Sequence, residues 1–196
     1  MTGFERHRRS GRIIATFTGF EADLLRSLTS QMVELLRNER AEPAAAISDP
    51  FDAMTAEFSG ATTIPEDPVL ARLFPTAYPD DEDAAADFRR FTESGLRDGK
   101  AAASGLVIDA LEEAGLPPEL TEEGLVIDVE LSEPDAEAWM RAFTDIRLAL
   151  ATRLEVRSGD EDYWDSLPDD DPRAQAHDIY EWVGWLQESI IEALTS

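Results

Sequence analysis

The chain has 196 residues and carries 42 Asp and Glu side chains against 17 Lys and Arg, a formal net charge of −25 at pH 7. A body this acidic repels phosphates, which excludes broad affinity for duplex nucleic acid. The absence of cysteine excludes disulfides, thiolate metal sites and thiol-based redox sensing. The two histidines, His7 and His177, are too few for a structural zinc site.

Length and apolar content predict one folded domain over residues 1–196. Hydrophobic residues make up 43% of the chain, which is too many for a disordered polyanion. No run approaches the roughly 18 apolar residues of a membrane span, and no apolar signal core follows the N-terminal arginines. We therefore expect a cytoplasmic protein with no membrane partner.

Residues 1–12 form a basic segment that we expect to be an arm or part of a β-hairpin. Ser10-Gly11 is a turn signal, and the β-forming residues 13–18 follow it. Basic arms can contact phosphates even when the body of a protein is acidic. The same side chains are equally suited to pairing with the protein's own acidic loops. The candidate nucleic-acid contacts are Arg6, Arg8, Arg9 and Arg12.

The first helix is predicted from about Phe20 to Arg37. Thr18 and Glu21 have the spacing of a capping box, which marks the start of a helix. Residues 40–66 mix Ala, Gly, Pro and Thr and are predicted as a loop-rich connection, with one short helix opening at Asp49-Pro50. The apolar stripe of the first helix recurs every three or four positions, at Phe20, Leu24, Leu25, Leu28, Met32, Leu35 and Leu36.

Two helices are predicted to follow this connection. Asp67-Pro68 combines a capping residue with a first-turn proline and predicts a short helix that ends before Pro75. A long helical pattern then begins at Asp80, and glycines at 95, 99 and 105 indicate a kink or break near its middle. Its apolar positions are Phe88, Phe91, Leu106, Val107, Ile108 and Leu111, and apolar stripes of this kind normally face a core.

Residues 125–131 alternate apolar and polar positions, which is the clearest strand pattern in the chain. Ser132 and Asp135 repeat the capping-box spacing before a helix that extends to Leu154, and Asp171-Pro172 opens the last helix. The predicted fold is therefore mainly α: a helical bundle with a small antiparallel sheet, formed by the N-terminal hairpin and the strand near 125–131.

A candidate partner surface lies in the C-terminal third of the chain. Trp185 lies off the apolar stripe of the last helix, so it either widens the buried face or marks a partner surface. Residues 160–171 contain seven carboxylates and no cation, and residues 101–140 contain eleven carboxylates and no cation. Such runs are suited to docking a basic partner, although most charge runs are solvated surface. We assign Trp185, Asp160, Asp162, Asp169 and Asp170 to this surface.

Motifs of known enzyme classes are absent from the sequence. It contains no phosphate-binding loop, nucleophile elbow, zinc-binding HExxH helix or dinucleotide glycine fingerprint. The acidic segment 160–171 lacks the spacing and central glycine of a calcium-binding EF-hand. We therefore predict no catalytic, cofactor-binding or metal-binding residues and no cofactor. An uncharacterised enzyme that uses carboxylates stays an alternative, because acid–base catalysis can rest on carboxylates alone.

Four stretches together carry a resemblance to a known family. They are DPVLARLFPTAY at 67–78, FRRFT at 88–92 with Leu96-Arg97 and Lys100, DIRLAL at 145–150 after Trp139, and YEWVGWLQE at 180–188. In these stretches the chain resembles an actinobacterial family catalogued as a domain of unknown function. The resemblance implies a small, mostly helical, cytoplasmic protein linked to the transcriptional response to oxidative stress, alongside protein-turnover and cysteine-synthesis genes.

One property departs from what that resemblance implies. A disulfide switch cannot form in a chain with no cysteine. Oxidation of Met32, Met54 or Met140 is a poor substitute, because these positions are expected to be largely buried.

These observations favour a non-enzymatic regulatory or interaction protein that acts through protein partners. Such a partner would be basic or part of the transcription machinery, and a homodimer through Trp185 is a further expectation. The alternative is a regulator that binds DNA directly through the basic N-terminus, since the body itself is unsuited to nucleic acid.

Overall fold

A computed structural model describes residues 2–38, 61–120, 124–168 and 170–196. The expected helix at Asp49-Pro50 and most of the loop-rich connection lie outside these residues, and residues 61–66 are irregular. In the described ranges, no helix is long and apolar enough to cross a membrane. The elements are β1 (Thr2–Arg6), β2 (Ile13–Thr18), α1 (Gly19–Asn38), α3 (Pro68–Leu73), α4 (Glu82–Glu113), β3 (Val126–Leu131), α5 (Glu133–Leu154), α6 (Glu161–Asp165) and α7 (Pro172–Thr195).

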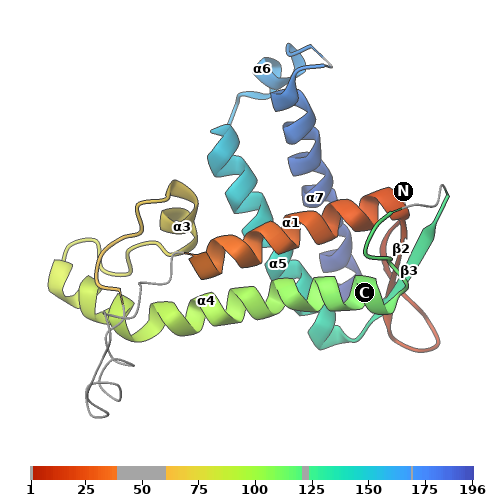
Figure 1. The fold of residues 1–196 in the computed structure, drawn as a ribbon, viewed down its shortest axis with the longest axis horizontal. Helices are drawn as coiled ribbons and strands as arrows, with labels where there is room; N and C mark the ends of the chain where they lie inside the picture. The colour runs from red at the N-terminus through yellow and green to blue at the C-terminus, as the bar shows by residue number, and fades with distance from the viewer. Residues whose placement is uncertain (1, 39–60, 121–123, 169) are drawn as a thin grey trace.

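The helices are arranged as two packed pairs, which confirms the predicted mainly α fold. α1 lies along α4 and α5 lies along α7, and contacts between α4 and α5 join the pairs (Figure 1). The short helix α3 packs on α5, and α6 lies at the outer end of the α5–α7 pair. The small sheet lies at the other end of α7, where both chain termini are found.

The sheet confirms the predicted joining of the N-terminal hairpin to the strand near 125–131. Its antiparallel strands have the order β1-β2-β3, so the β2 strand is central. Ile13 pairs with Leu131 and Phe17 pairs with Ile127, and all four side chains are buried. The alternation of buried and exposed positions along β2 and β3 places one face of the sheet on the helices.

An aromatic cluster joins the sheet to α5. The ring centroid of Trp139 lies 5.6 Å from that of Phe4 in β1 and 6.2 Å from that of Phe17 in β2. Phe143, one turn along α5, lies 5.8 Å from Trp139. Each fully buried aromatic side chain contributes roughly 1.5–3 kcal/mol, so this cluster helps to hold the sheet on the helices, together with the packing of β1 on α7.

The predicted helix starts are confirmed by their hydrogen bonds. The Thr18 amide donates to Glu21 Oε2 at 2.8 Å, and the Glu21 amide donates to Thr18 Oγ1 at 3.2 Å. Ser132 and Asp135 form the same reciprocal box before α5. The stripe assigned to α1 is wrong in one position, because the Phe20 side chain is 70% exposed. Phe20 lies in the first turn, beyond the surface that α4 covers.

The α4 helix departs most from prediction. It continues from Glu82 to Glu113, so the predicted break is wrong. At the glycines 95, 99 and 105, an added Cβ would meet no atom within 4 Å, so these residues serve no close packing. Phe88, Phe91 and Leu106 are exposed, contrary to their assignment to the core, while Val107 and Leu111 are buried as expected.

Candidate functional site

The basic segment at the N-terminus is the outer hairpin of the sheet, and its arginines have divided roles. Arg6 donates from Nε to the Ala193 carbonyl at 3.0 Å and from Nη2 to the Leu194 carbonyl at 3.1 Å. It therefore caps the last turn of α7, where free carbonyls and the helix dipole favour a cation. Arg12 donates to the Glu130 carbonyl at 3.0 Å and lies 3.4 Å from the Glu130 carboxylate.

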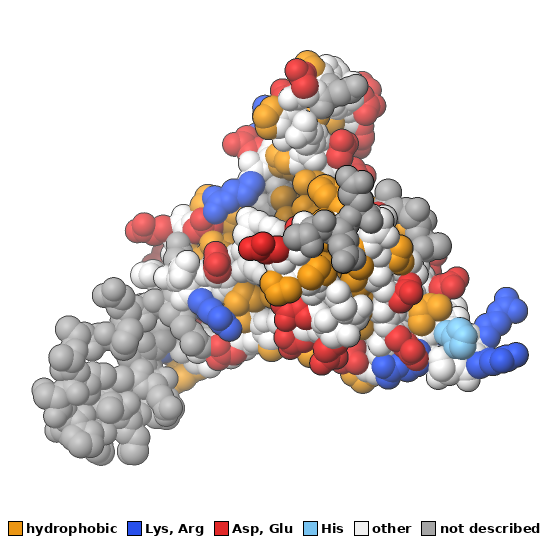
Figure 2. Space-filling view, turned by 45° about the vertical axis from the view of Figure 1, so that its right-hand side comes forward, with side chains coloured by type: hydrophobic (Ala, Val, Ile, Leu, Met, Phe, Trp, Pro, Cys, Tyr) orange, Lys and Arg blue, Asp and Glu red, His pale blue; other side chains and the backbone are white. Residues whose placement is uncertain are grey.

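Arg8 and Arg9 lie in the hairpin turn and are exposed. Among the residues that the structure describes, neither has an acidic partner, so both remain available for an external anion. Figure 2 shows blue side chains beside a pale blue histidine at the hairpin end of the molecule, and red acidic side chains scattered among orange and white ones over the rest of that face. Of the four candidate nucleic-acid contacts, Arg6 and Arg12 bind groups of the protein itself, whereas Arg8 and Arg9 do not within the described ranges.

Trp185 and the acidic residues assigned with it do not form one surface. Trp185 is 37% exposed and lies beside β1, where a Cβ on Gly3 would be 3.3 Å from its ring. Asp162 and Asp170 are exposed beyond the other end of α7, and Asp160 is half-buried there. Trp185 lies 13 residues beyond Pro172, the first residue of α7, which is roughly 20 Å along the helix. Asp169 lies outside the described residues.

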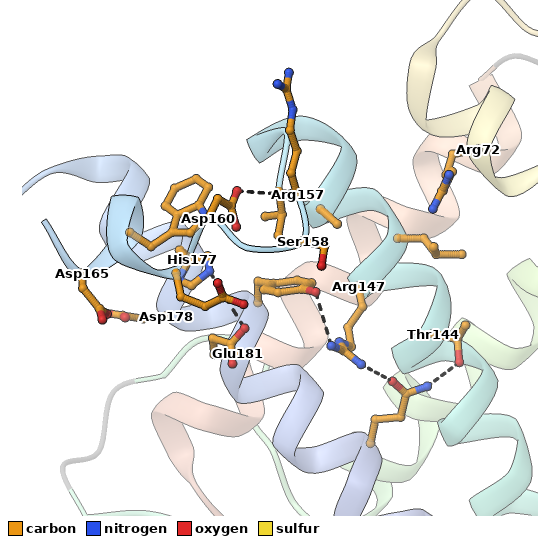
Figure 3. Close-up of a pocket in the computed structure, with 17 residues that line it drawn as sticks. Arg72, Thr144, Arg147, Arg157, Ser158, Asp160, Asp165, His177, Asp178 and Glu181 are labelled. Atoms are coloured by element: carbon orange, nitrogen blue, oxygen red, sulfur yellow. Dashed lines mark hydrogen bonds and ion pairs between the residues drawn. The ribbon is translucent and has the colours of Figure 1, made fainter. Parts of the chain in front are cut away.

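A cleft of about 870 Å³ opens where α5, α6 and α7 meet, and the side chain of Arg72 from α3 reaches its edge (Figure 3). The apolar residues Leu148, Ala151 and Val156 line it. Trp164 of α6 and Tyr180 of α7 supply aromatic walls. A volume of this size is within the range of small-molecule sites, so the cleft is the candidate binding site of this protein.

Arg147 of α5 is the most strongly positioned side chain in the cleft. Its Nη1 donates to Gln187 Oε1 at 2.9 Å, and Gln187 is itself held by a 2.6 Å hydrogen bond from Nε2 to Thr144 Oγ1. Its guanidinium carbon lies 5.0 Å from the centre of the Tyr180 ring. The Nε atom is buried without a hydrogen-bond partner and packs against Gly184. Contacts on three sides therefore fix the guanidinium.

The guanidinium of Arg147 has no carboxylate within ion-pair distance in the described part of the chain, and the same holds for Arg72. The charges of Arg147 and Arg72 therefore remain available to a ligand.

The opposite wall of the cleft is acidic. It comes from α6, the residue before it, and the first half of α7, and Figure 3 shows its labelled carboxylates across the cleft from Arg147. His177 lies on this side and stacks on Trp164, with ring centroids 4.4 Å apart and planes inclined by 6°. The acidic side chains that line the cleft are Asp160, Glu161, Asp165, Asp178 and Glu181.

Sequence reasoning found the acidic residues at 160–171 but did not identify Arg147, Arg72 or the cleft. Two local signals were present. Arg147 interrupts the apolar run from Ile146 to Leu150, and Gly184 lies in the middle of a helix, where glycine costs stability without a packing reason. Neither signal says that the two residues meet, because they are on different helices.

A second surface covers the outer side of the first half of α4. Tyr78, Phe88, Phe91 and Leu96 are between 42% and 64% exposed, and the rings of Tyr78 and Phe88 are 5.8 Å apart. We call these four residues the α4 apolar surface. A groove of about 240 Å³ lies between this surface and residues 73–77.

Charged side chains occupy the inner side of the same helix. Glu93 lies 2.5 Å from Arg89 and 2.8 Å from Arg97, and all three residues are at most 7% exposed. Arg89 also donates to the Phe74 carbonyl, and Arg97 donates to the Leu36 carbonyl. The α4 helix therefore buries an ion-pair network and exposes aromatic side chains, which is the reverse of the usual arrangement.

Comparison with known proteins gives a family match and several relatives. A family model described as a domain of unknown function, DUF2017, matches residues 1–194. A protein named putative oxidative stress regulator AosR in Mycobacterium leprae is 33% identical over 187 residues, covering 89% of this chain and 78% of that protein. Proteins named oxidative stress regulator AosR in Mycobacterium tuberculosis and Mycobacterium bovis are 30% identical over 200 residues, covering 95% of this chain and 84% of theirs. No solved structure gives a significant match.

Proposed function

The chain belongs to the DUF2017 family, and we propose that it is a regulatory protein of the oxidative stress response that acts through a protein partner rather than through catalysis. The names of the mycobacterial relatives support the regulatory role, because those relatives align with nearly the whole chain. The α4 apolar surface supports the action through a partner, and it is the observation that carries the proposal.

Exposed aromatic side chains that lie next to each other mark interaction sites more often than isolated ones do. Tyr78 and Phe88 form such a pair, with ring centroids 5.8 Å apart, and Phe91 is exposed three positions further along α4. The groove that Phe88 lines has room for one or two partner side chains. The buried network of Arg89, Glu93 and Arg97 anchors the inner side of α4 to the Phe74 and Leu36 carbonyls. The surface is therefore presented on a rigid helix, which lowers the entropic cost of docking.

Charge around the α4 apolar surface indicates the chemistry of the partner. The exposed charged residues between positions 82 and 98 are four acids and one base: Glu82, Asp83, Asp87 and Asp98 against Arg90. The partner that fits is a protein segment with one or two apolar side chains for the groove and Lys or Arg residues on either side. Nucleic acid fits poorly, because this acidic surface repels phosphates.

We propose that the redox signal reaches this protein through another molecule. The chain has no cysteine, Met32 is 4% exposed and Met140 is half-buried. Met54 lies outside the described residues. We propose that the partner, rather than this chain, carries the oxidant-sensitive group.

The test replaces two exposed aromatic residues of the α4 apolar surface. The F88S/F91S variant should fold, as judged by circular dichroism and thermal melting, but should lose the change in transcript levels that the wild-type protein supports after peroxide treatment of its host. A matched control, F20S/Y163S, removes two aromatic residues that are 70% and 41% exposed at other places on the molecule. The control should behave as the wild type does. A normal transcript response in F88S/F91S would contradict the proposal.

A photo-crosslinking residue at position 91 tests the partner itself. Cross-linking from position 91 should capture one protein whose contact segment is basic and apolar, and cross-linking from position 163 should not. Capture of the same protein from both positions would show that the α4 apolar surface is not the contact.

A second candidate function, direct binding of DNA, is favoured by the exposed Arg8 and Arg9 at the hairpin turn. Two cations supply little affinity by themselves, since each phosphate contact adds only a small salt-dependent increment.

A further inference from the structure

The cleft between α5, α6 and α7 carries two opposite charged walls, and neither is neutralised by the other. Arg147 and Arg72 lie on the side of α5 and α3, and five carboxylates lie on the side of α6 and α7 (Figure 3). A third arginine of the cleft, Arg157, pairs with Glu155 at 3.6 Å. Within the described residues, no ion pair joins an arginine of the first wall to a carboxylate of the second. The separation of the walls leaves a polar space with a positive and a negative side.

Ligands with a single charge fit this space poorly. A simple anion would be attracted by Arg147 but repelled by the five carboxylates. A simple cation would be attracted by the carboxylates but repelled by Arg147. A neutral ligand would gain no ionic interaction from either wall. A molecule with an anionic and a cationic end satisfies both walls together.

The details of each wall match a carboxylate and an ammonium group. The guanidinium of Arg147 is held in one orientation, because Nη1 donates to Gln187, Nη2 donates to the Tyr180 hydroxyl at 3.4 Å and Gly184 covers Nε. Each Nη atom has a second hydrogen, which a ligand carboxylate can accept as a charge-assisted hydrogen bond. Asp178 and Glu181 lie one turn apart on α7, where an ammonium group between them can donate hydrogen bonds to both.

Apolar side chains of the cleft match the carbon skeleton of such a molecule. Leu148 and Ala151 of α5 and Val156 just beyond it line the cleft, and the cleft volume of about 870 Å³ is large enough for more than a single amino acid. We propose that this cleft binds a free zwitterionic amino acid derivative of the size of a short peptide, with its carboxylate on Arg147 and Arg72 and its ammonium group on the acidic wall. The proposal does not rest on the α4 apolar surface, because it involves a different set of residues.

The experiment uses the full chain and three forms of one probe, in isothermal titration calorimetry at low ionic strength. Trialanine carries both charges, N-acetyl-trialanine lacks the cation, and trialanine amide lacks the anion. Trialanine should bind saturably, and each blocked form should bind at least about tenfold more weakly, because one wall then loses its partner. Equal binding of all three forms would overturn the proposal, as would the absence of saturable trialanine binding up to ~10 mM.

Variants of α5 locate the binding. R147Q should weaken trialanine binding at least about tenfold, and R147K should weaken it less, because Lys keeps the charge but loses the planar fork. R141Q is the matched control, since Arg141 is an exposed arginine of the same helix outside the cleft. R147Q should also abolish the preference for trialanine over trialanine amide, a change that mere loosening of the fold would not produce. Retention of that preference in R147Q would overturn the assignment of the carboxylate to Arg147.

Discussion

Gly184 of α7 lies directly against the guanidinium of Arg147 of α5, so that a Cβ at position 184 would come 3.1 Å from Arg147 Cζ and 3.2 Å from Nε. A Cβ at these distances would be closer than ordinary van der Waals contact, so only glycine fits here without a shift of Arg147. It means that the backbone of α7 forms one side of the slot that holds the guanidinium. The position of a glycine on one helix therefore decides the orientation of a cation on another.

G184A should displace the Arg147 guanidinium and break its 2.9 Å hydrogen bond to Gln187. Alanine is favoured over glycine in a helix by about 0.5–1 kcal/mol, and the displacement of Arg147 offsets this gain. The expected result is little net change in the free energy of unfolding but an altered Arg147 side-chain resonance in NMR spectra. The control is G99A, where a Cβ meets nothing within 4 Å. G99A should raise the free energy of unfolding by about 0.5–1 kcal/mol. An equal gain in G184A would show that a Cβ at position 184 does not displace Arg147.

E93Q should destabilise the protein by about 3–5 kcal/mol, because it leaves Arg89 and Arg97 buried without their shared carboxylate. Denaturant unfolding monitored by tryptophan fluorescence measures this loss. D87N neutralises an exposed carboxylate of the same helix and should stay within about 0.5 kcal/mol of wild type. If both variants unfold at the same denaturant concentration, the buried network contributes no stability.

K100M should destabilise the protein at neutral pH by about 3–5 kcal/mol, because it removes the cation that lies 2.6 Å from the buried carboxylate of Asp145. Burial raises the pKa of Asp145 above its usual 3.8, although Lys100 acts in the opposite direction. A carboxyl whose pKa is raised by folding favours the folded state below its unfolded pKa, and this contribution is lost as the pH rises through the folded pKa. The deficit of K100M should therefore shrink as the pH falls toward the pKa of Asp145, which a melting series over pH measures. A deficit that is constant with pH would contradict this account.

D67A should cost about 1 kcal/mol, because the Asp67 carboxylate accepts the Val69 and Leu70 amides at the start of α3. Burial raises the pKa of Asp67, but the hydrogen bonds from Arg153 and from these amides outweigh it, so the pKa lies below its usual 3.8. A carboxyl with a lowered pKa contributes its stability above the unfolded pKa and loses it as the pH falls through the folded pKa. The difference between D67A and wild type should therefore narrow in acid, and D80A, at an exposed residue before α4, should show no such change.

R8A/R9A should abolish any binding of the protein to DNA while leaving the fold intact, because both side chains are exposed and lack acidic partners in the described structure. A mobility-shift titration at low salt measures the effect. R6A is instructive as a comparison, since Arg6 caps α7 through the Ala193 and Leu194 carbonyls. R6A should lower the melting temperature, because it removes this cap from α7. DNA binding that survives in R8A/R9A would remove the hairpin turn from consideration.

The ends of the helices and the strand at Val126–Leu131 could be predicted from sequence because their causes are local. A capping box requires two residues three positions apart, as in Thr18 and Glu21, and the alternation of a strand is visible along six residues. The inner side of α4 could not be predicted in this way. Hydrophobic periodicity places Phe88 and Phe91 inside, whereas the carbonyls of Phe74 and Leu36 accept hydrogen bonds from Arg89 and Arg97 and turn the charged side inward.

The mainly α fold, the hairpin, the negative charge and the absence of a thiol switch could be predicted, because each depends on composition or on neighbours along the chain. Three other features required the folded structure: Arg6 and Arg12 bind groups of the protein itself, Trp185 lies apart from the acidic loop, and Arg147, Tyr180 and Gln187 converge in one cleft. The physical reason is that a guanidinium or a carboxylate takes its role from the groups within a few ångströms of it. Those groups lie on other helices, and spacing along the sequence does not record their proximity.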